Sequence, residues 1–205
     1  MKVAICPCAL PKVSLSMNAF FTSRARLASL LFCFLFALGV TDSRAADTTK
    51  SGHMQLTSTA FGEGEPIPVK YTCEDKNVSP PLKWSGAPPG TTSLALIVDD
   101  PDAPAGTWIH WVLYDLAANI SELPEDLVKG QHLSNGAKQG LNDFKHLGYG
   151  GPCPPPGNPH RYFFKLYALD APLDLKPGAT KQAVEQAMGK HVLAQAQLMG
   201  TYKRK

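Results

Sequence analysis

Short apolar runs separated by glycine and proline predict a domain built mainly of β-strands. Residues 92–99 (TSLALIVD) are almost continuously apolar between a Pro-Pro-Gly turn and an Asp-Pro turn, which is typical of a strand buried on both faces. Residues 108–116 and 162–169 are rich in aromatic and branched side chains and carry no helix cap. Both are therefore predicted to be strands.

The remaining segments give weaker signals. Residues 55–59 and 69–72 are candidate short strands, while residues 76–90 contain four prolines and are predicted to be mostly extended loop. Residues 180–202 carry apolar side chains near one helical stripe, with Thr180 placed as an N-cap, so this segment is the predicted helix. The pattern thus predicts a strand-rich domain with a late helix.

The N-terminal 45 residues have the layout of a secretory signal. Two arginines precede a fourteen-residue apolar run from Leu27 to Val40, which is shorter than the roughly 20 residues that span a bilayer. Small residues at Ser43 and Ala45 suit a signal peptidase, so we predict cleavage after Ala45 and a single domain over residues 46–205. An uncleaved N-terminal anchor is the alternative, and translation could start at Met1 or Met17.

Removing this segment changes the charge balance. The whole chain carries a formal net charge of +3, but residues 46–205 keep fifteen basic and sixteen acidic side chains, a net charge of −1. The one basic cluster left is the tail Lys203-Arg204-Lys205, so the counterion-release contribution that drives nucleic-acid binding is missing. Nucleic acid is not an expected partner.

Two cysteines, Cys73 and Cys153, lie beyond the predicted cleavage site. An even number of cysteines in an oxidising compartment predicts a disulfide between them. Two unconnected buried thiols are the alternative.

Polar groups gather at the predicted strand ends. Asp99, Asp100 and Asp102 crowd a proline-stiffened turn, and His110 lies in the next strand, on the face of Trp108 and Val112 by its period of two. A single histidine in an aromatic strand is more often a satisfied core residue than a functional one.

Taken together, these groups favour an anion site. His160 and Tyr162 share one face of the last predicted strand, and residues 148–151 (GYGG) offer backbone N–H groups. A carboxylate such as Asp100, bonded to one nitrogen of an imidazole, fixes the tautomer and leaves the other nitrogen to donate to an anion.

Six motifs resemble the phosphatidylethanolamine-binding proteins, also called Raf kinase inhibitor-like proteins, in their bacterial YbhB/YbcL-type branch. They run in the family order over nearly the whole of residues 46–205: 77–84 (NVSPPLKW), 100–104 (DPDAP), 108–111 (WIHW), 142–144 (NDF), 148–152 (GYGGP) and 159–162 (PHRY). The resemblance implies a mostly β, sandwich-like fold with Greek-key topology and a C-terminal helix. It also implies a small pocket for phosphate, sulfate or carboxylate groups, formed by Asp100, Asp102, Pro104, His110, Gly151, His160 and Tyr162.

The expected function is therefore that of a periplasmic or secreted binding protein for phosphate, a phosphorylated head group or a carboxylate, with no cofactor and no stable membrane insertion after cleavage. The exported bacterial members also look similar in their cysteine pairing, and the mammalian members carry a longer helical tail over the pocket.

Several alternatives stay open. The same pocket could regulate a protein partner, and a homodimer is compatible with the sequence. A hydrolase or phosphotransferase would need a nucleophile, for which Ser79 and Ser85 are the candidates. The histidines and aspartates could also hold a metal, although no H-x-x-H or C-x-x-C spacing supports one.

Overall fold

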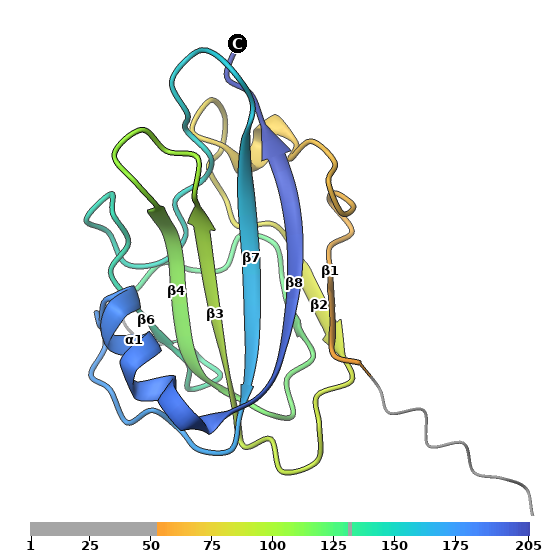
Figure 1. The fold of residues 1–205 in the computed structure, drawn as a ribbon, viewed down its shortest axis with the longest axis vertical. Coiled ribbons are helices and arrows are strands. Elements are labelled where there is room, and N and C mark those ends of the chain that lie inside the picture. The colour runs from red at the N-terminus through yellow and green to blue at the C-terminus, as the bar shows by residue number, and fades with distance from the viewer. Residues whose placement is uncertain (1–52, 131–132) are drawn as a thin grey trace, which may run out of the picture. The chain divides into compact units, whose positions relative to one another are not determined.

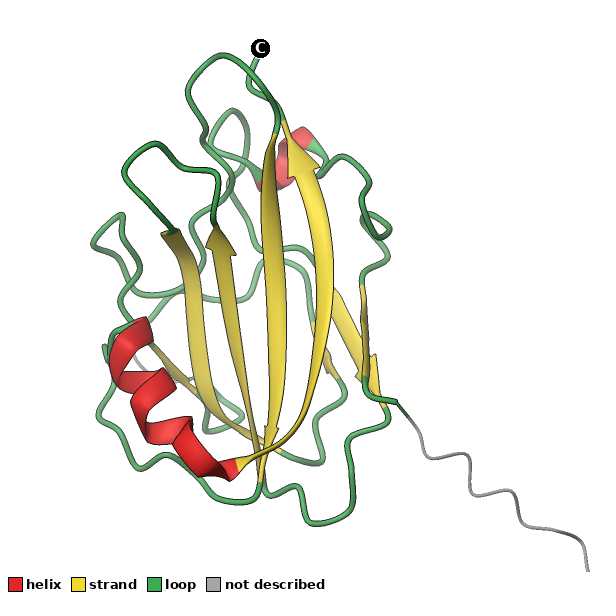
Figure 2. Cartoon of the chain, in the orientation of Figure 1, coloured by secondary structure: helices red, strands yellow, loops and turns green. Residues whose placement is uncertain are grey.

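The computed structural model describes residues 53–130 and 133–205. These residues form two antiparallel sheets, with loops and short helices between the strands (Figures 1 and 2). The smaller sheet has the order β1-β2-β5, with β1 at Gln55–Thr57, β2 at Leu82–Ser85 and β5 at Glu122–Leu123. The larger sheet has the order β6-β4-β3-β7-β8, with β6 at Lys138–Gln139, β4 at Trp108–Ala117, β3 at Ser93–Asp100, β7 at His160–Leu169 and β8 at Val192–Tyr202. The predicted signal segment and its cleavage site lie outside the described residues.

The strand order of the larger sheet is that of a Greek key. β3 and β4 form a hairpin, β6 follows on the outside of β4, and β7 returns over a long connection to lie beside β3. The mostly β, Greek-key fold expected from the sequence is confirmed.

The central strands β3 and β4 of the larger sheet are buried on both faces. One face packs against the smaller sheet, where Leu56 and Trp84 meet Leu96 and Phe164. Helix α1 (Lys181–Met188) covers the other face (Figure 2), and its Val184 packs in a second apolar cluster with residues of β3 and β4. This explains why every residue of β3 is buried, as the continuous apolar run predicted.

The helix predicted over residues 180–202 is much shorter than expected. Thr180 caps α1 by accepting a hydrogen bond from the Ala183 N–H, but the helix ends at Met188, because Gly189 takes a positive φ of 31°. A 3-10 turn (η2, Gly189–His191) follows, and residues 192–202 form β8, which pairs with β7 along its length. None of the helices in the described residues is long and apolar enough to cross a membrane.

One smaller prediction is wrong, and a second is confirmed with one addition. Residues 69–72 are not a strand: Val69–Tyr71 form a 3-10 turn (η1) that follows Pro68. The proline-rich stretch 76–90 contains the short strand β2, whose side chains alternate between buried and exposed. The strands predicted around 92–99, 108–116 and 162–169 are confirmed as β3, β4 and β7.

Candidate functional site

A cavity of about 190 Å³ lies at the end of the larger sheet where β3 ends and β4 and β7 begin, at the top of Figure 1. Of the seven residues expected in a pocket, four line it: Asp100, Pro104, His110 and His160. The rest of the wall is formed by Ala103, Trp108, Phe144, Cys153, Pro154 and Pro155. Asp102, Gly151 and Tyr162 are not part of its lining.

A β-bulge directs His110 toward this cavity. Val98 pairs with Trp111 and Asp99 pairs with Ile109, so His110 is the extra residue of β4. A bulge of this kind re-aims one side chain and interrupts the alternation of faces. His110 and Val112 therefore do not share a face, contrary to the period-two expectation.

The protonation of His110 is set by burial and by one carbonyl. Its Nδ1 lies 2.7 Å from the carbonyl oxygen of Gly150, so Nδ1 must carry the hydrogen. The side chain is 2% exposed, and burial lowers the pKa of His110, opposed by the Gly150 carbonyl and by the charge of Asp100. His110 is therefore neutral at pH 7 and its Nε2 is a hydrogen-bond acceptor.

His160 forms the carboxylate-imidazole pair that the sequence predicted. Its Nδ1 lies 2.8 Å from Oδ2 of Asp100, and both side chains are buried. The other carboxylate oxygen of Asp100 accepts the Asp102 N–H at 2.8 Å, which holds the turn after β3 in place. Asp100 thus fixes the His160 ring with its Nε2 unconstrained by any described residue.

Asp102 is occupied by an arginine. Its oxygens accept hydrogen bonds from the Arg161 side chain at 2.7 and 2.9 Å and from the Arg161 N–H at 2.9 Å. These bonds lower the pKa of Asp102 to about 2. Asp102 therefore ties the β3–β4 turn to β7 beside the cavity.

Tyr162 lies behind the cavity wall, packed against His110. Its ring packs edge-on against His110, with 5.1 Å between the ring centroids, and the residue is 1% exposed. Burial above all, and then the nearby Asp100 charge, raise the pKa of Tyr162 above its usual range. Its hydroxyl makes no hydrogen bond of normal geometry within the described residues, although Asp100 lies near enough to act as a weak acceptor that also raises this pKa.

The glycine loop donates its hydrogen bonds within the protein. The Gly150 N–H donates to the carbonyl of His110 at 2.9 Å, and the Gly151 N–H donates to Oδ1 of Asn77 at 2.7 Å. A side chain at residue 151 would start 2.2 Å from the carbonyl oxygen of Tyr71. Gly151 therefore allows two loops to pack closely, and neither N–H faces an anion as the loop pattern suggested.

The disulfide between Cys73 and Cys153 is present, as predicted, and closes a sequence separation of 80 residues. It anchors the proline-rich run 152–159 to the loop after η1, together with the Cys73 N–H bond to the Pro152 carbonyl at 3.1 Å. Pro154 and Pro155 of this run form part of the cavity wall.

Phe144 is the wall residue that sequence reasoning gave no role. Its ring packs edge-on against Trp108 and His110, with centroid distances of 5.4 and 5.3 Å. Phe144 also lines a second cavity of about 280 Å³ that contains Lys129 and His146. The 142–144 motif was a signal for this position, but it did not indicate which residue faces the ligand.

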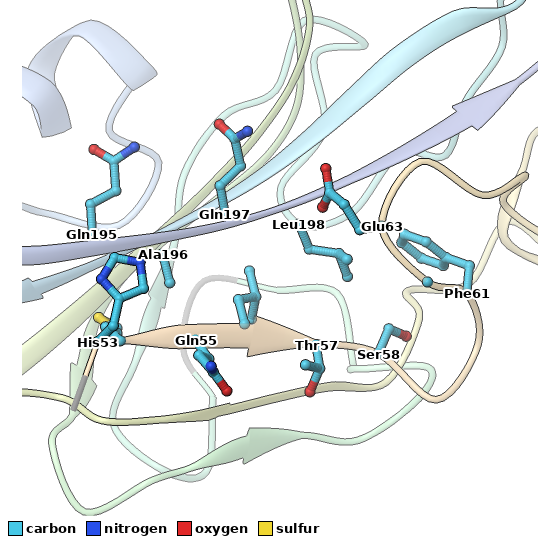
Figure 3. Close-up of a pocket in the computed structure, with 13 residues that line it drawn as sticks. His53, Gln55, Thr57, Ser58, Phe61, Glu63, Gln195, Ala196, Gln197 and Leu198 are labelled. Atoms are coloured by element: carbon cyan, nitrogen blue, oxygen red, sulfur yellow. The ribbon is translucent and has the colours of Figure 1, made fainter. Parts of the chain in front are cut away.

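The two serines considered as nucleophiles lie away from the cavity. Ser79 is buried and accepts a hydrogen bond from the Leu127 N–H, and neither Ser79 nor Ser85 lines the cavity. Within residues 53–130 and 133–205, no group of three or more His, Cys, Asp or Glu side chains is placed to hold a metal ion. A larger groove of about 660 Å³ lies between β1 and β8, and none of these site residues lines it (Figure 3).

Comparison with known proteins identifies the family of this chain. The sequence model of the phosphatidylethanolamine-binding protein family matches residues 57–203. A UPF0098 protein of Methanothermobacter thermautotrophicus is 51% identical over 151 residues, which cover 74% of this chain and 99% of that protein. A UPF0098 protein of Aquifex aeolicus is 52% identical over 153 residues, covering 74% of this chain and 89% of that protein.

Two crystal structures have the same fold. A putative phosphatidylethanolamine-binding protein homologue from Chlamydia trachomatis has a TM-score of 0.69 and 46% identity, covering 76% of this chain and 100% of its own. E. coli YbcL, described as a new member of the mammalian family, has a TM-score of 0.69 and 35% identity, covering 75% and 99%. This chain therefore belongs to the phosphatidylethanolamine-binding protein family.

Proposed function

We propose that this protein is an exported, non-catalytic binding protein whose cavity holds a phosphate-type or other small anionic group. The supporting observation is that two imidazoles with fixed Nδ1 hydrogens, His110 and His160, line one small cavity. Their Nε2 atoms are the ring positions left for a ligand. The apolar wall of Trp108 and Phe144 keeps water from competing for those contacts.

The His110 ring favours a ligand that can donate a hydrogen bond. Neutral His110 offers an acceptor at Nε2, so it bonds directly to an anion that still carries a proton, such as a phosphate monoanion. A fully ionised ligand must bring in one proton from solution to protonate His110, at a cost set by its lowered pKa. Affinity should therefore fall as pH rises, and binding of an ionised ligand should take up about one proton.

Isothermal titration with inorganic phosphate tests this proposal. His160→Asn should weaken phosphate binding at least tenfold, because it removes the Nε2 contact with the anion. His191→Asn is the matched control: His191 also pairs with a carboxylate, Asp170, at 2.7 Å, but on the surface and away from the cavity. Equal affinity of both variants and the wild type would exclude the cavity as the phosphate site, and an affinity unchanged from pH 5.5 to 8.5 would exclude the role of the histidines.

Export is part of the same proposal. It is supported by the apolar run Leu27–Val40 and by the disulfide, since such bonds persist in oxidising compartments. The mass of the protein purified from its own host should correspond to a chain that begins at Ala46. A chain that keeps its N-terminal 45 residues would contradict cleavage.

A further inference from the structure

The outer edge of β8 is paired along only part of its length. The Gly64 N–H donates to the Met199 carbonyl at 2.8 Å, and the Ile67 N–H donates to the Thr201 carbonyl at 2.7 Å. The Thr201 N–H in turn donates to the Glu65 carbonyl at 2.9 Å. Residues 64–67 thus act as a short added strand at the C-terminal end of β8.

This pairing stops before the middle of the strand. Backbone groups of alternate residues point to the same side of a strand, so Gln197 and Gln195 direct their N–H and carbonyl groups to the edge that Met199 and Thr201 use. No residue in the described part of the chain is backbone-paired with them on that side. The Met199 N–H is bonded to Oε2 of Glu63 at 2.9 Å, which marks where the internal pairing ends.

A groove of about 660 Å³ runs along this open edge, between β8 and β1 (Figure 3). Ala196 and Leu198 of β8, with Leu56 of β1 and Phe61, give it an apolar floor. The side chains of Gln195 and Gln197 point away from β1 and leave the edge uncovered (Figure 3). The site therefore combines an open row of backbone donors and acceptors with an adjacent apolar surface.

We propose that this groove binds an extended segment of a partner protein, which continues the short strand 64–67 along β8. Backbone groups that repeat every second residue match an extended polypeptide, and strand addition to a free edge is a common mode of peptide recognition. The floor suits an apolar side chain at every second position of the segment.

Charge sets the remaining requirement on the partner. Glu63 is the one acidic side chain that lines the groove, and it lies at the end where the internal pairing stops. A lysine or arginine at that end of the segment would pair with the Glu63 carboxylate. This proposal is independent of the anion cavity, which lies elsewhere in the fold.

Fluorescence anisotropy of the full chain with synthetic peptides tests the proposal. The probe is an eight-residue capped peptide of alternating valine and threonine with a lysine at each end. Gln197→Pro removes one outward N–H without breaking a bond to β7, and should weaken binding about tenfold, whereas Gln197→Ala keeps that N–H and should bind within twofold of wild type. Glu63→Gln keeps an acceptor for the Met199 N–H and should weaken binding of this peptide, because the lysine loses its carboxylate partner.

A probe that leaves the protein unchanged guards against a folding defect in the proline variant. Two N-methylated peptides are compared, one methylated at the odd-numbered and one at the even-numbered backbone nitrogens. Only the peptide whose methyl groups block the N–H groups that face β8 should lose binding. Equal binding of both methylated peptides would overturn the proposal. So would slow hydrogen exchange of the Gln195 and Gln197 amides in the free monomer, which would mean that the chain's own N-terminal residues fill the edge. Protection that appears only with dimerisation would assign the groove to a second copy.

Discussion

The buried hydroxyl of Tyr162 gives the sharpest test of the site. A hydroxyl without a partner in a protein interior costs about 1–3 kcal/mol, because it loses its bonds to water and gains none. Tyr162→Phe removes that oxygen and keeps the ring that packs against His110. We therefore expect the ligand-free variant to be about 1 kcal/mol more stable, which raises Tm by about 2–4 °C for a domain of this size.

Tyr149→Phe is the matched control. Tyr149 is also buried, but its hydroxyl donates to the Tyr71 carbonyl at 2.8 Å, so its removal leaves that carbonyl unpaired. This variant should lose about 1–2 kcal/mol. Urea unfolding and thermal melting of the two variants beside the wild type measure both changes.

The opposite result for Tyr162 would refute the reasoning. If Tyr162→Phe were as unstable as the control, the hydroxyl would be bonded in solution, and Asp100 is the neighbour whose charge it feels. If the variant gains stability and also binds phosphate less well, the hydroxyl is an unpaired group that serves the ligand. Gain of stability without loss of affinity would remove Tyr162 from the binding site.

Three further outcomes are expected. Replacing both Cys73 and Cys153 with alanine should lower the free energy of unfolding by about 4 kcal/mol, because the bridge closes a separation of 80 residues. Urea unfolding measures this change, and a loss below about 1 kcal/mol would contradict an entropic origin of the stabilisation. The lowered pKa of His110 means that the folded state resists protonation, so stability should be complete above about pH 6.5 and fall below it by at most about 1.4 kcal/mol per pH unit. His110→Gln should flatten that decline, and an unchanged slope would point to another group. Gly151→Ala should cost about 1–3 kcal/mol by thermal melting, because its methyl group would meet the Tyr71 carbonyl, whereas lost phosphate affinity at unchanged stability would make Gly151 a direct ligand contact.

The strands that form the centre of the fold could be predicted because their residues leave little choice. β3 carries the apolar run Leu94–Val98, and β7 is rich in aromatic side chains, so both favour a buried sheet over a helix. β8 could not be predicted by the same reasoning, because alanine, glutamine and leucine have high helix propensity. Its alternation of Ala194, Gln195, Ala196 and Gln197 is a period-two signal, but pairing with β7 was needed to decide it.

The site was predictable only in part: four of the seven expected residues line the cavity and Asp100 pairs with His160, but the other hydrogen bonds were not anticipated. The motifs brought Asp100, His110 and His160 to one cavity, since turns and strand ends fix which residues meet. Two features depended on tertiary packing: the bulge at His110, and the Asn77 contact that occupies the Gly151 N–H. Neither feature could be predicted from residue spacing or composition, because each depends on a partner that is distant in the sequence.

One consequence follows from the position of Phe144. Its ring borders both the 190 Å³ cavity and the 280 Å³ cavity beside it, while the charged recognition groups lie on other residues. Phe144 thus shares with Cys153 the boundary between the two cavities. A small side chain in place of Phe144 would enlarge the space at this boundary and admit a longer molecule, at the cost of the ring that packs against His110. Relatives that differ at this position could therefore keep both histidines and diverge in the tail that they accept.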